Sequence, residues 1–290
     1  MRIDVRRVVV VGLVYACALG LAGCTSPTAA APSPSATSNL EALCADTAVA
    51  LCANISDGIV VTVAEAATER ETLELAGRLS ELAAAASLDA GAVLERAAVD
   101  ITPLDPEVSN PPRWRLPVYP GDSAEVEHRL RDILTVAAVP GTLGINVVDG
   151  WPSVTVASLD QFDPVFDAVS ATPLFDAGGT YTLLSLDEQL RIVHVPDRTS
   201  NEAIHEIVDI ARDYPTAEVL LEAPTAGLQF PTLYVARLTP EEVVQLDSRL
   251  RDPRLATADL DGYALSYVLA STGTDGTSYT NGTFGAVPTE

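Results

Sequence analysis

The side chains best suited to chemistry in this chain are its three histidines and its 40 carboxylates. The run from His205 to Asp209, His-Glu-Ile-Val-Asp, places a histidine and an acid one helical turn apart. A zinc-binding helix of this kind needs an imidazole at both places, with the glutamate polarising a water molecule. Because the second place holds an aspartate, and Ile207 and Val208 are typical of a core, we expect a helix with a surface histidine and no metal.

Other candidates for catalysis are weaker. His194 alternates with Leu190 and Ile192, which is typical of a strand residue on one face of a sheet. The pattern Gly-x-Ser-x-Gly of a serine nucleophile does not occur, and 40 acids are too many to single out a glycosidase pair. The run Asp259-x-Asp261-Gly262 lacks the remaining oxygen ligands of a calcium loop and indicates a turn. The sequence therefore predicts no catalytic residue, no metal and no cofactor.

The ionic composition excludes several classes of function. All 17 basic residues are arginines, whereas P-loops, Schiff-base enzymes and Ser-x-x-Lys acylases each need a lysine. The formal net charge of −23 repels phosphate backbones, so we expect no binding to nucleic acid. Arginine without lysine is typical of a GC-rich, actinobacterium-like genome.

The N-terminus has the three-part layout of a secretory signal peptide. Arginines precede an apolar run from Val8 to Leu21, and small residues follow that run. The run is about 14 residues long, short of the ~20 that cross a bilayer as a helix. We therefore predict that residues 1–23 are a signal and not an anchor.

The tetrad Leu21-Ala22-Gly23-Cys24 at the end of this run resembles the lipobox of bacterial lipoproteins. In that family the cysteine thiol receives a diacylglycerol and the chain is cut just before it. The resemblance implies that lipidated Cys24 anchors the protein to the outer face of the cell membrane. Two or three acyl chains, at ~0.8 kcal/mol per buried methylene, make such an attachment lasting. The alternative is an ordinary secreted protein.

Cys44 and Cys52 remain once the signal is removed and Cys24 is lipidated. In an exported protein such a pair predicts a disulfide. On one straight helix the two residues would lie ~12 Å apart, too far to bond. We therefore expect a turn near Asp46 to Ala48.

The segments at both ends of the body differ from it in composition. Residues 24–39 consist mainly of Thr, Ser, Pro and Ala and predict a disordered tether. The folded part begins near Leu40, and residues 271–290, rich in Gly, Thr and Ser, predict a flexible tail.

Between these ends, hydrophobic periodicity predicts five strand-helix-strand units. Helix starts are indicated by Thr68 with Glu71, by Asp122, by Asp160, by Thr199 with Glu202, and by Thr239 with Glu242. Turns are indicated at Asp149-Gly150 and Asp187-Glu188. The expected strands are 58–64, 97–102, 114–119, 143–147, 153–157, 181–186, 191–195, 218–222, 232–237 and 263–270.

This order predicts an α+β fold of tandem ferredoxin-like βαββαβ units, with helices on one face of mainly antiparallel sheets. Our preferred division has an N-terminal βαβ segment with the cysteine pair at 40–112, and two ferredoxin-like units at 113–186 and 187–270. The other division pairs the first unit with the second and the third with the fourth. Residues 144–175 also resemble the hairpin and helix of BON domains, which implies association with membranes or envelope components.

In the last expected strand Tyr263, Leu265, Tyr267 and Leu269 share one face, and neither face is polar. Either the strand is buried on both faces, or Tyr263 and Tyr267 form part of a partner-binding surface.

We interpret the chain as a cell-envelope lipoprotein of unspecified role that binds an envelope protein or cell-wall partner without catalysis. One alternative is an extracytoplasmic hydrolase whose acids and His205 assemble only in the fold. A solute-binding lipoprotein is disfavoured, because short βαβ units do not resemble two large lobes.

Overall fold

The computed structural model describes residues 34–55, 58–86, 92–97, 112–148, 151–176, 179–223, 231–260, 262, 264–273 and 276–286. Residues 1–23, Cys24, the turn at Asp149-Gly150 and Tyr263 lie outside this part. The predictions that fall on them therefore stay predictions.

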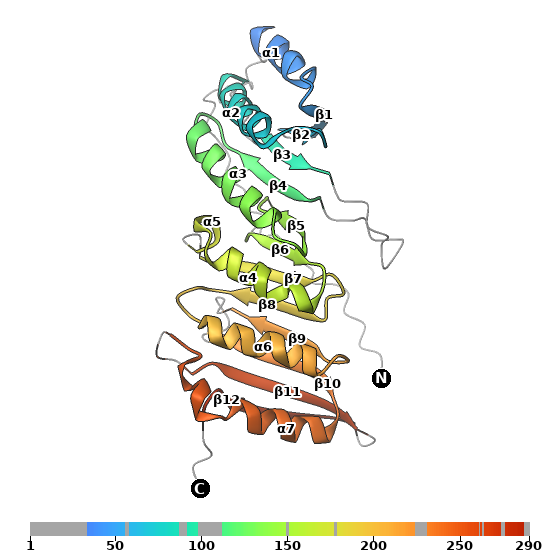
Figure 1. The fold of residues 1–290 in the computed structure, drawn as a ribbon, viewed down its shortest axis with the longest axis vertical. Coiled ribbons are helices and arrows are strands. Elements are labelled where there is room, and N and C mark those ends of the chain that lie inside the picture. Colours follow the sequence, from blue (N-terminus) through green and yellow to red (C-terminus); the bar gives the residue numbers. More distant parts are fainter. Residues whose placement is uncertain are drawn as a thin grey trace, which may run out of the picture. The chain divides into compact units, whose positions relative to one another are not determined.

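Helices and strands alternate along the described chain (Figure 1). The helices are α1 (Pro34–Cys44), α2 (Glu69–Ala86), α3 (Ser123–Ala137), α4 (Phe162–Ser170), α5 (Pro173–Asp176), α6 (Asn201–Asp213) and α7 (Pro240–Leu250), with 3-10 turns η1 (Leu159–Gln161) and η2 (Pro253–Thr257). The strands are β1 (Val49–Ile55), β2 (Gly58–Val63), β3 (Ala92–Arg96), β4 (Trp114–Val118), β5 (Thr142–Asn146), β6 (Ser153–Val156), β7 (Tyr181–Ser185), β8 (Leu190–His194), β9 (Glu218–Glu222), β10 (Thr232–Leu238), β11 (Ser266–Gly273) and β12 (Gly276–Thr283).

The described strands form one 12-stranded sheet in which the spatial order is the chain order. Antiparallel and parallel pairings alternate along it, beginning with the antiparallel pair β1 and β2 and the parallel pair β2 and β3. A helical connection joins the two strands of every parallel pair. Five strand-helix-strand units are therefore present as predicted, although the second strand of the first unit lies before the expected 97–102.

How these units combine was predicted wrongly. In a ferredoxin-like unit the two strands of a βαβ are separated by a third strand, whereas here they pair directly. The tandem ferredoxin-like arrangement is not confirmed, and the sheet is mixed instead of mainly antiparallel. Strand pairing also continues across the expected boundaries, because β3 pairs with β4 and β7 pairs with β8.

The helices form a layer over one face of the sheet (Figure 1). Neighbours in this layer touch: α2 packs on α3, α3 on α4, and α4 on α6. Strand direction reverses from each βαβ unit to the next while every connection advances the same way along the sheet. Because the helices all lie on one face, successive βαβ connections must alternate between right-handed and left-handed. In known proteins about 98% of βαβ connections are right-handed.

A continuous aliphatic core lies between this layer and the sheet. Alternate strand residues point toward the helices and are at most 1% exposed, among them Val61, Leu94, Leu116, Val154, Leu183, Ile192, Leu221, Val235 and Leu269. The helix stripes expected from periodicity face them, including Leu75, Leu79, Leu130, Ile133, Phe166, Ile207, Val208 and Leu246. Burial of these stripes supplies the main driving force for folding.

The predicted helix starts are confirmed in part. Asp122 accepts a hydrogen bond from the Glu125 amide, and Thr239 and Glu242 form a full capping box. Helix α6 is capped by Ser200 instead of Thr199, because Thr199 lies in an isolated bridge to Asp259. Asp160 does not cap α4, because η1 intervenes.

Both ends of the body contain more regular structure than composition predicts. Helix α1 begins at Pro34, inside the expected tether 24–39, and packs on α2. Strand β12 lies inside the expected tail 271–290 and pairs along β11. The expected strand 97–102 is also wrong in position, because its place beside β2 is taken by β3.

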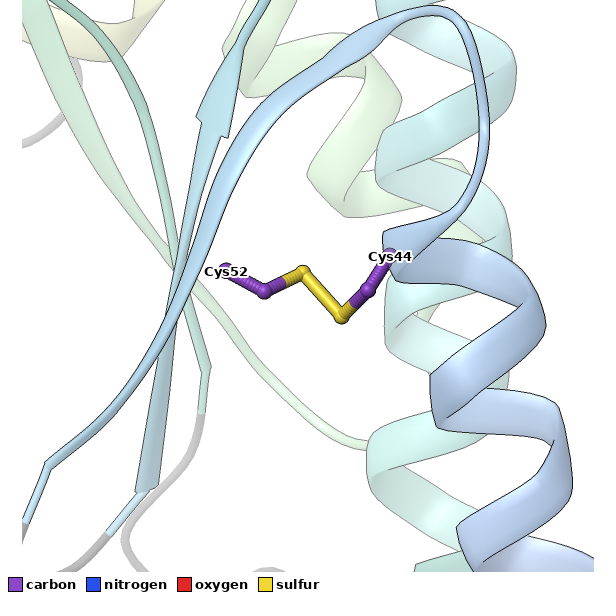
Figure 2. The surroundings of a disulfide bond; sticks show 2 residues. All are labelled: Cys44 and Cys52. Atoms are coloured by element: carbon purple, nitrogen blue, oxygen red, sulfur yellow. A yellow bond between two sulfur atoms is a disulfide. The ribbon is translucent and has the colours of Figure 1, made fainter.

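Figure 2 shows the disulfide between Cys44 at the end of α1 and Cys52 in β1, with a Cα–Cα distance of 5.8 Å. The chain reverses between them as predicted, with the Asp46 carboxylate accepting a hydrogen bond of 2.8 Å from the Ala48 amide. The bond therefore fixes the first helix to the first strand.

Candidate functional site

His205, the strongest candidate from the sequence, lies half-buried in α6 between two carboxylates of α4. Its Nδ1 is 2.7 Å from Asp163 Oδ1 and its Nε2 is 3.3 Å from Asp167 Oδ1. Arg212 approaches the other oxygen of Asp163 at 2.7 Å. Both ring nitrogens are engaged, so this cluster ties α4 to α6 and leaves His205 no nitrogen for a substrate. Within the described part, no group of three or more His, Cys, Asp or Glu side chains is placed to hold a metal.

His194 lies in a strand, as predicted, and its ring is 1% exposed beneath the helix layer. Its Nε2 is 3.0 Å from the Thr199 carbonyl oxygen, which can only accept, so this nitrogen carries the proton. Nδ1 then accepts from the Tyr181 hydroxyl at 2.8 Å. Burial lowers the pKa of His194 and raises the pKa of Tyr181 to about 12. The pair is a satisfied polar contact within the core.

Tyr267, offered as part of a partner surface, is 1% exposed beneath α7. Its hydroxyl donates to Asp247 Oδ1 at 2.6 Å, and its ring meets Phe284 edge-on. Burial and the Asp247 carboxylate raise the pKa of Tyr267. The sequence left two outcomes open for Tyr267, burial or a partner-binding surface, and the structure shows burial. The side chain is covered by helix α7 and not by a second sheet. The predicted surface at Tyr267 is absent.

The opposite face of the sheet, which we call the open face, is covered by none of the described helices (Figure 1). One row of side chains on it lies in register across six strands, namely Thr62, Glu95, Arg115, Asn146, Ser153 and Thr182. Arg115 Nε is 3.0 Å from Glu95 Oε2, and Thr62 donates to the same carboxylate at 3.2 Å. Thr62 and Thr182 at the ends of this row are buried, at 9% and 8% exposure, and the four residues between them are half-buried.

A second row on the open face is mainly apolar and contains one charged residue. It consists of Thr155, Leu184, Arg191, Leu220, Tyr234 and Val268 in register from β6 to β11. Strand β8 alternates, so Leu190, Ile192 and His194 point into the core while Arg191 points out. The only charge in this row therefore stands between two leucines.

The open face is hollowed where these two rows meet. The hollow has a volume of about 560 Å³ and is lined by Trp151, Ser153, Thr182, Leu184, Glu188, Arg191, Glu218, Val219 and Leu220. Trp151 precedes β6 and is 51% exposed, in contrast to Trp114 at 1%. The volume falls within the ~300–1,000 Å³ of sites for small molecules.

Arg191 differs from the other arginines. Among those in the described part of the chain, it alone makes no hydrogen bond, ion pair or ring contact. The turn before it is held by Asp187, whose carboxylate accepts from Ser185 at 2.6 Å and from the Gln189 amide at 3.2 Å. The hairpin stabilised by Asp187 therefore presents to the hollow a guanidinium that has no partner among the described residues.

Sequence reasoning did not single out Trp151, Leu184, Arg191 or Leu220. Alternation in β8 did place Arg191 on the face of the strand opposite His194, but only strand pairing brings Leu184 and Leu220 beside it.

Within the described residues no helix combines the length and apolarity that a membrane span requires. Comparisons with protein-family models, with curated proteins and with solved structures found no match for this chain.

Proposed function

We propose that this protein is a cell-envelope lipoprotein, anchored through lipidated Cys24, whose open face binds a protein or cell-wall partner without catalysing a reaction. The observation that carries the proposal is the hollowed open face of the sheet, with Trp151 and Arg191 among its lining residues. The lipobox resemblance supplies the expected location.

The composition of the open face supports binding. Tryptophan, tyrosine and arginine are enriched in protein interfaces, and here Trp151, Tyr234 and Arg191 lie on one surface among leucines. The polar row from Thr62 to Thr182 borders this apolar part. An apolar centre beside a polar border is the arrangement that contact surfaces commonly have.

The helix layer is a weaker candidate. Its His205 cluster is internally paired, and its buried histidine, His194, is fully satisfied. Exposed apolar side chains there are isolated, such as Val244 on α7 at 69% exposure. Isolated apolar residues on a surface are ordinary.

The proposal is tested by measuring whether a substitution on the open face abolishes retention of a partner. The full chain, purified with its anchor, is immobilised and exposed to envelope extract and to purified cell wall. Leu220→Arg places a second arginine in the hollow, whereas the matched control Val244→Arg places an arginine on the outside of α7. We expect the wild type and the control to retain the same partner and Leu220→Arg to lose it. Equal retention by all three proteins would exclude the open face, provided that their circular dichroism spectra agree.

A further inference from the structure

The hollow of the open face has the chemistry of a specific ligand site. We propose that it binds a pyranose sugar bearing a carboxylate, with the carboxylate on Arg191 and the ring against Trp151. The inference rests on the proposed function, because it names the ligand class of the same face.

Arg191 selects for an anion. Its guanidinium has no partner among the described residues, although the chain carries a net charge of −23 and pairs most of its other arginines with acids. A guanidinium offers two parallel N–H donors that match a carboxylate. Leu184 and Leu220 lie directly beside it in the neighbouring strands, and Arg191 itself is exposed, so a ligand in the hollow can reach the guanidinium.

Trp151 supplies a flat apolar surface. About half of its side chain is exposed at the edge of the hollow, while the other tryptophan is buried in the core. An indole combines a large apolar ring face with one polar N–H. A sugar ring has the same dual character, with C–H groups on its faces and hydroxyls around its edge.

The remaining polar side chains of the hollow favour a sugar over a hydrocarbon acid. Ser153 and Thr182 offer hydroxyls, and Glu188 and Glu218 offer carboxylate oxygens. Glu218 is ion-paired with Arg237, which restrains its position. A fatty chain would cover these groups without replacing their hydrogen bonds to water, at a cost in free energy. Sugar hydroxyls donate to carboxylates and exchange hydrogen bonds with hydroxyls.

Two commercial sugars that differ mainly in the carboxylate make a direct test. N-acetylmuramic acid bears a lactyl carboxylate on the pyranose ring, whereas N-acetylglucosamine bears none. Each is titrated into the full chain while tryptophan fluorescence and the heat of binding are recorded. Because Trp114 is buried, a ligand-dependent fluorescence change reports on Trp151. We expect saturable binding of the acidic sugar and at least about tenfold weaker binding of the neutral one.

Arg191→Gln removes the charge and leaves Trp151 in place as the reporter. It should weaken the acidic sugar about tenfold and leave the neutral sugar unchanged. The matched control Arg70→Gln, on the exposed side of α2, should bind like the wild type. Equal affinity for the two sugars, equal affinity in Arg191→Gln and wild type, or no saturable binding would each overturn the inference. Partner capture that is still lost in Leu220→Arg would then leave the proposed function standing.

Discussion

Arg191 in β8 lies directly opposite Leu220 in β9, on the face of the sheet that none of the described helices covers. The two residues lie in the two strands of one strand-helix-strand unit, joined by α6, so the surface they share exists only after the parallel pair β8 and β9 has formed. Side chains on the other face of the same strands, such as Ile192 and Leu221, fill the core. One sheet thus separates a face that packs in the core from the face that we propose binds a partner.

Removal of the disulfide should lower stability without changing the fold of the central strands. The Cys44–Cys52 bond closes a loop with a sequence separation of 8, for which the chain-entropy relation gives about 2.5 kcal/mol. Urea unfolding of the wild type with and without reductant, and of Cys44→Ala/Cys52→Ala, measures this loss. An unchanged unfolding midpoint would show that the bond contributes nothing to the folded state.

Tyr267 should be sensitive to small and large changes alike. Tyr267→Phe removes the hydrogen bond to Asp247 and should cost about 1–2 kcal/mol, whereas Tyr267→Asp buries an unpaired charge and should prevent folding. Thermal unfolding followed by circular dichroism distinguishes the two. A folded, soluble Tyr267→Asp protein would contradict the burial of this side chain under α7.

Gly282 in β12 lies opposite Tyr267 and makes room for its ring. A Cβ at this position would come within 2.1 Å of the tyrosine hydroxyl oxygen, so a side chain there forces the ring or the strand to move. Gly282→Val should therefore destabilise the protein by about 1–3 kcal/mol. Gly276→Val, at the first residue of β12, is not a suitable control, because Gly276 has a positive φ. Thr280→Val on the same strand is the matched control. Equal unfolding midpoints for the two variants would refute the close approach.

Stability should fall on acidification through His194. Burial lowers the pKa of His194, so between the folded-state pKa and the unfolded value of about 6.5 only the unfolded chain takes up the proton. Its contribution is therefore complete above pH 6.5 and is lost as the pH falls toward the folded-state pKa. NMR titration of the ring should give a midpoint below 6.5. A midpoint at or above that value would mean that the ring is not held neutral in the core.

Anchoring is tested by changing the proposed lipidation site. Cys24→Ser removes the thiol, so the variant should no longer be found in the membrane fraction. The wild-type chain should begin at Cys24 and should carry the additional mass of the acyl groups. Western blots of cell fractions and intact-mass spectrometry measure both effects. A Cys24→Ser protein that remains in the membrane fraction would refute a lipid anchor at this residue.

Local patterns predicted the elements well because each depends on near neighbours. The stripe Leu75, Leu79 and Leu82 identifies α2, and the box at Thr239 and Glu242 identifies α7. The disulfide and its turn also followed from spacing, since a straight helix cannot bring Cys44 and Cys52 together. Strand β12 was missed because its exposed run of Gly, Thr and Ser carries no apolar alternation.

Pairing between strands could not be predicted from the sequence. A βαβ unit whose two strands pair directly has the same sequence pattern as one whose strands are separated by a third strand. Tyr267 shows the consequence: its alternation with Leu265 and Leu269 indicated one face of a strand but not whether a helix covers that face. The hollow illustrates the same limit, because Trp151, Arg191 and Leu220 come from separate parts of the chain. Its chemistry arises only from the order of strands in the sheet.

Photo-crosslinking in intact cells tests the central claim, that the open face is the contact surface. A photoreactive amino acid replaces Leu184 in the hollow or, as the matched control, Val244 on α7, in the full-length chain. We predict that irradiation yields a discrete crosslinked product from position 184 and none from position 244. Crosslinks from position 244 alone, or from neither position, would contradict the account.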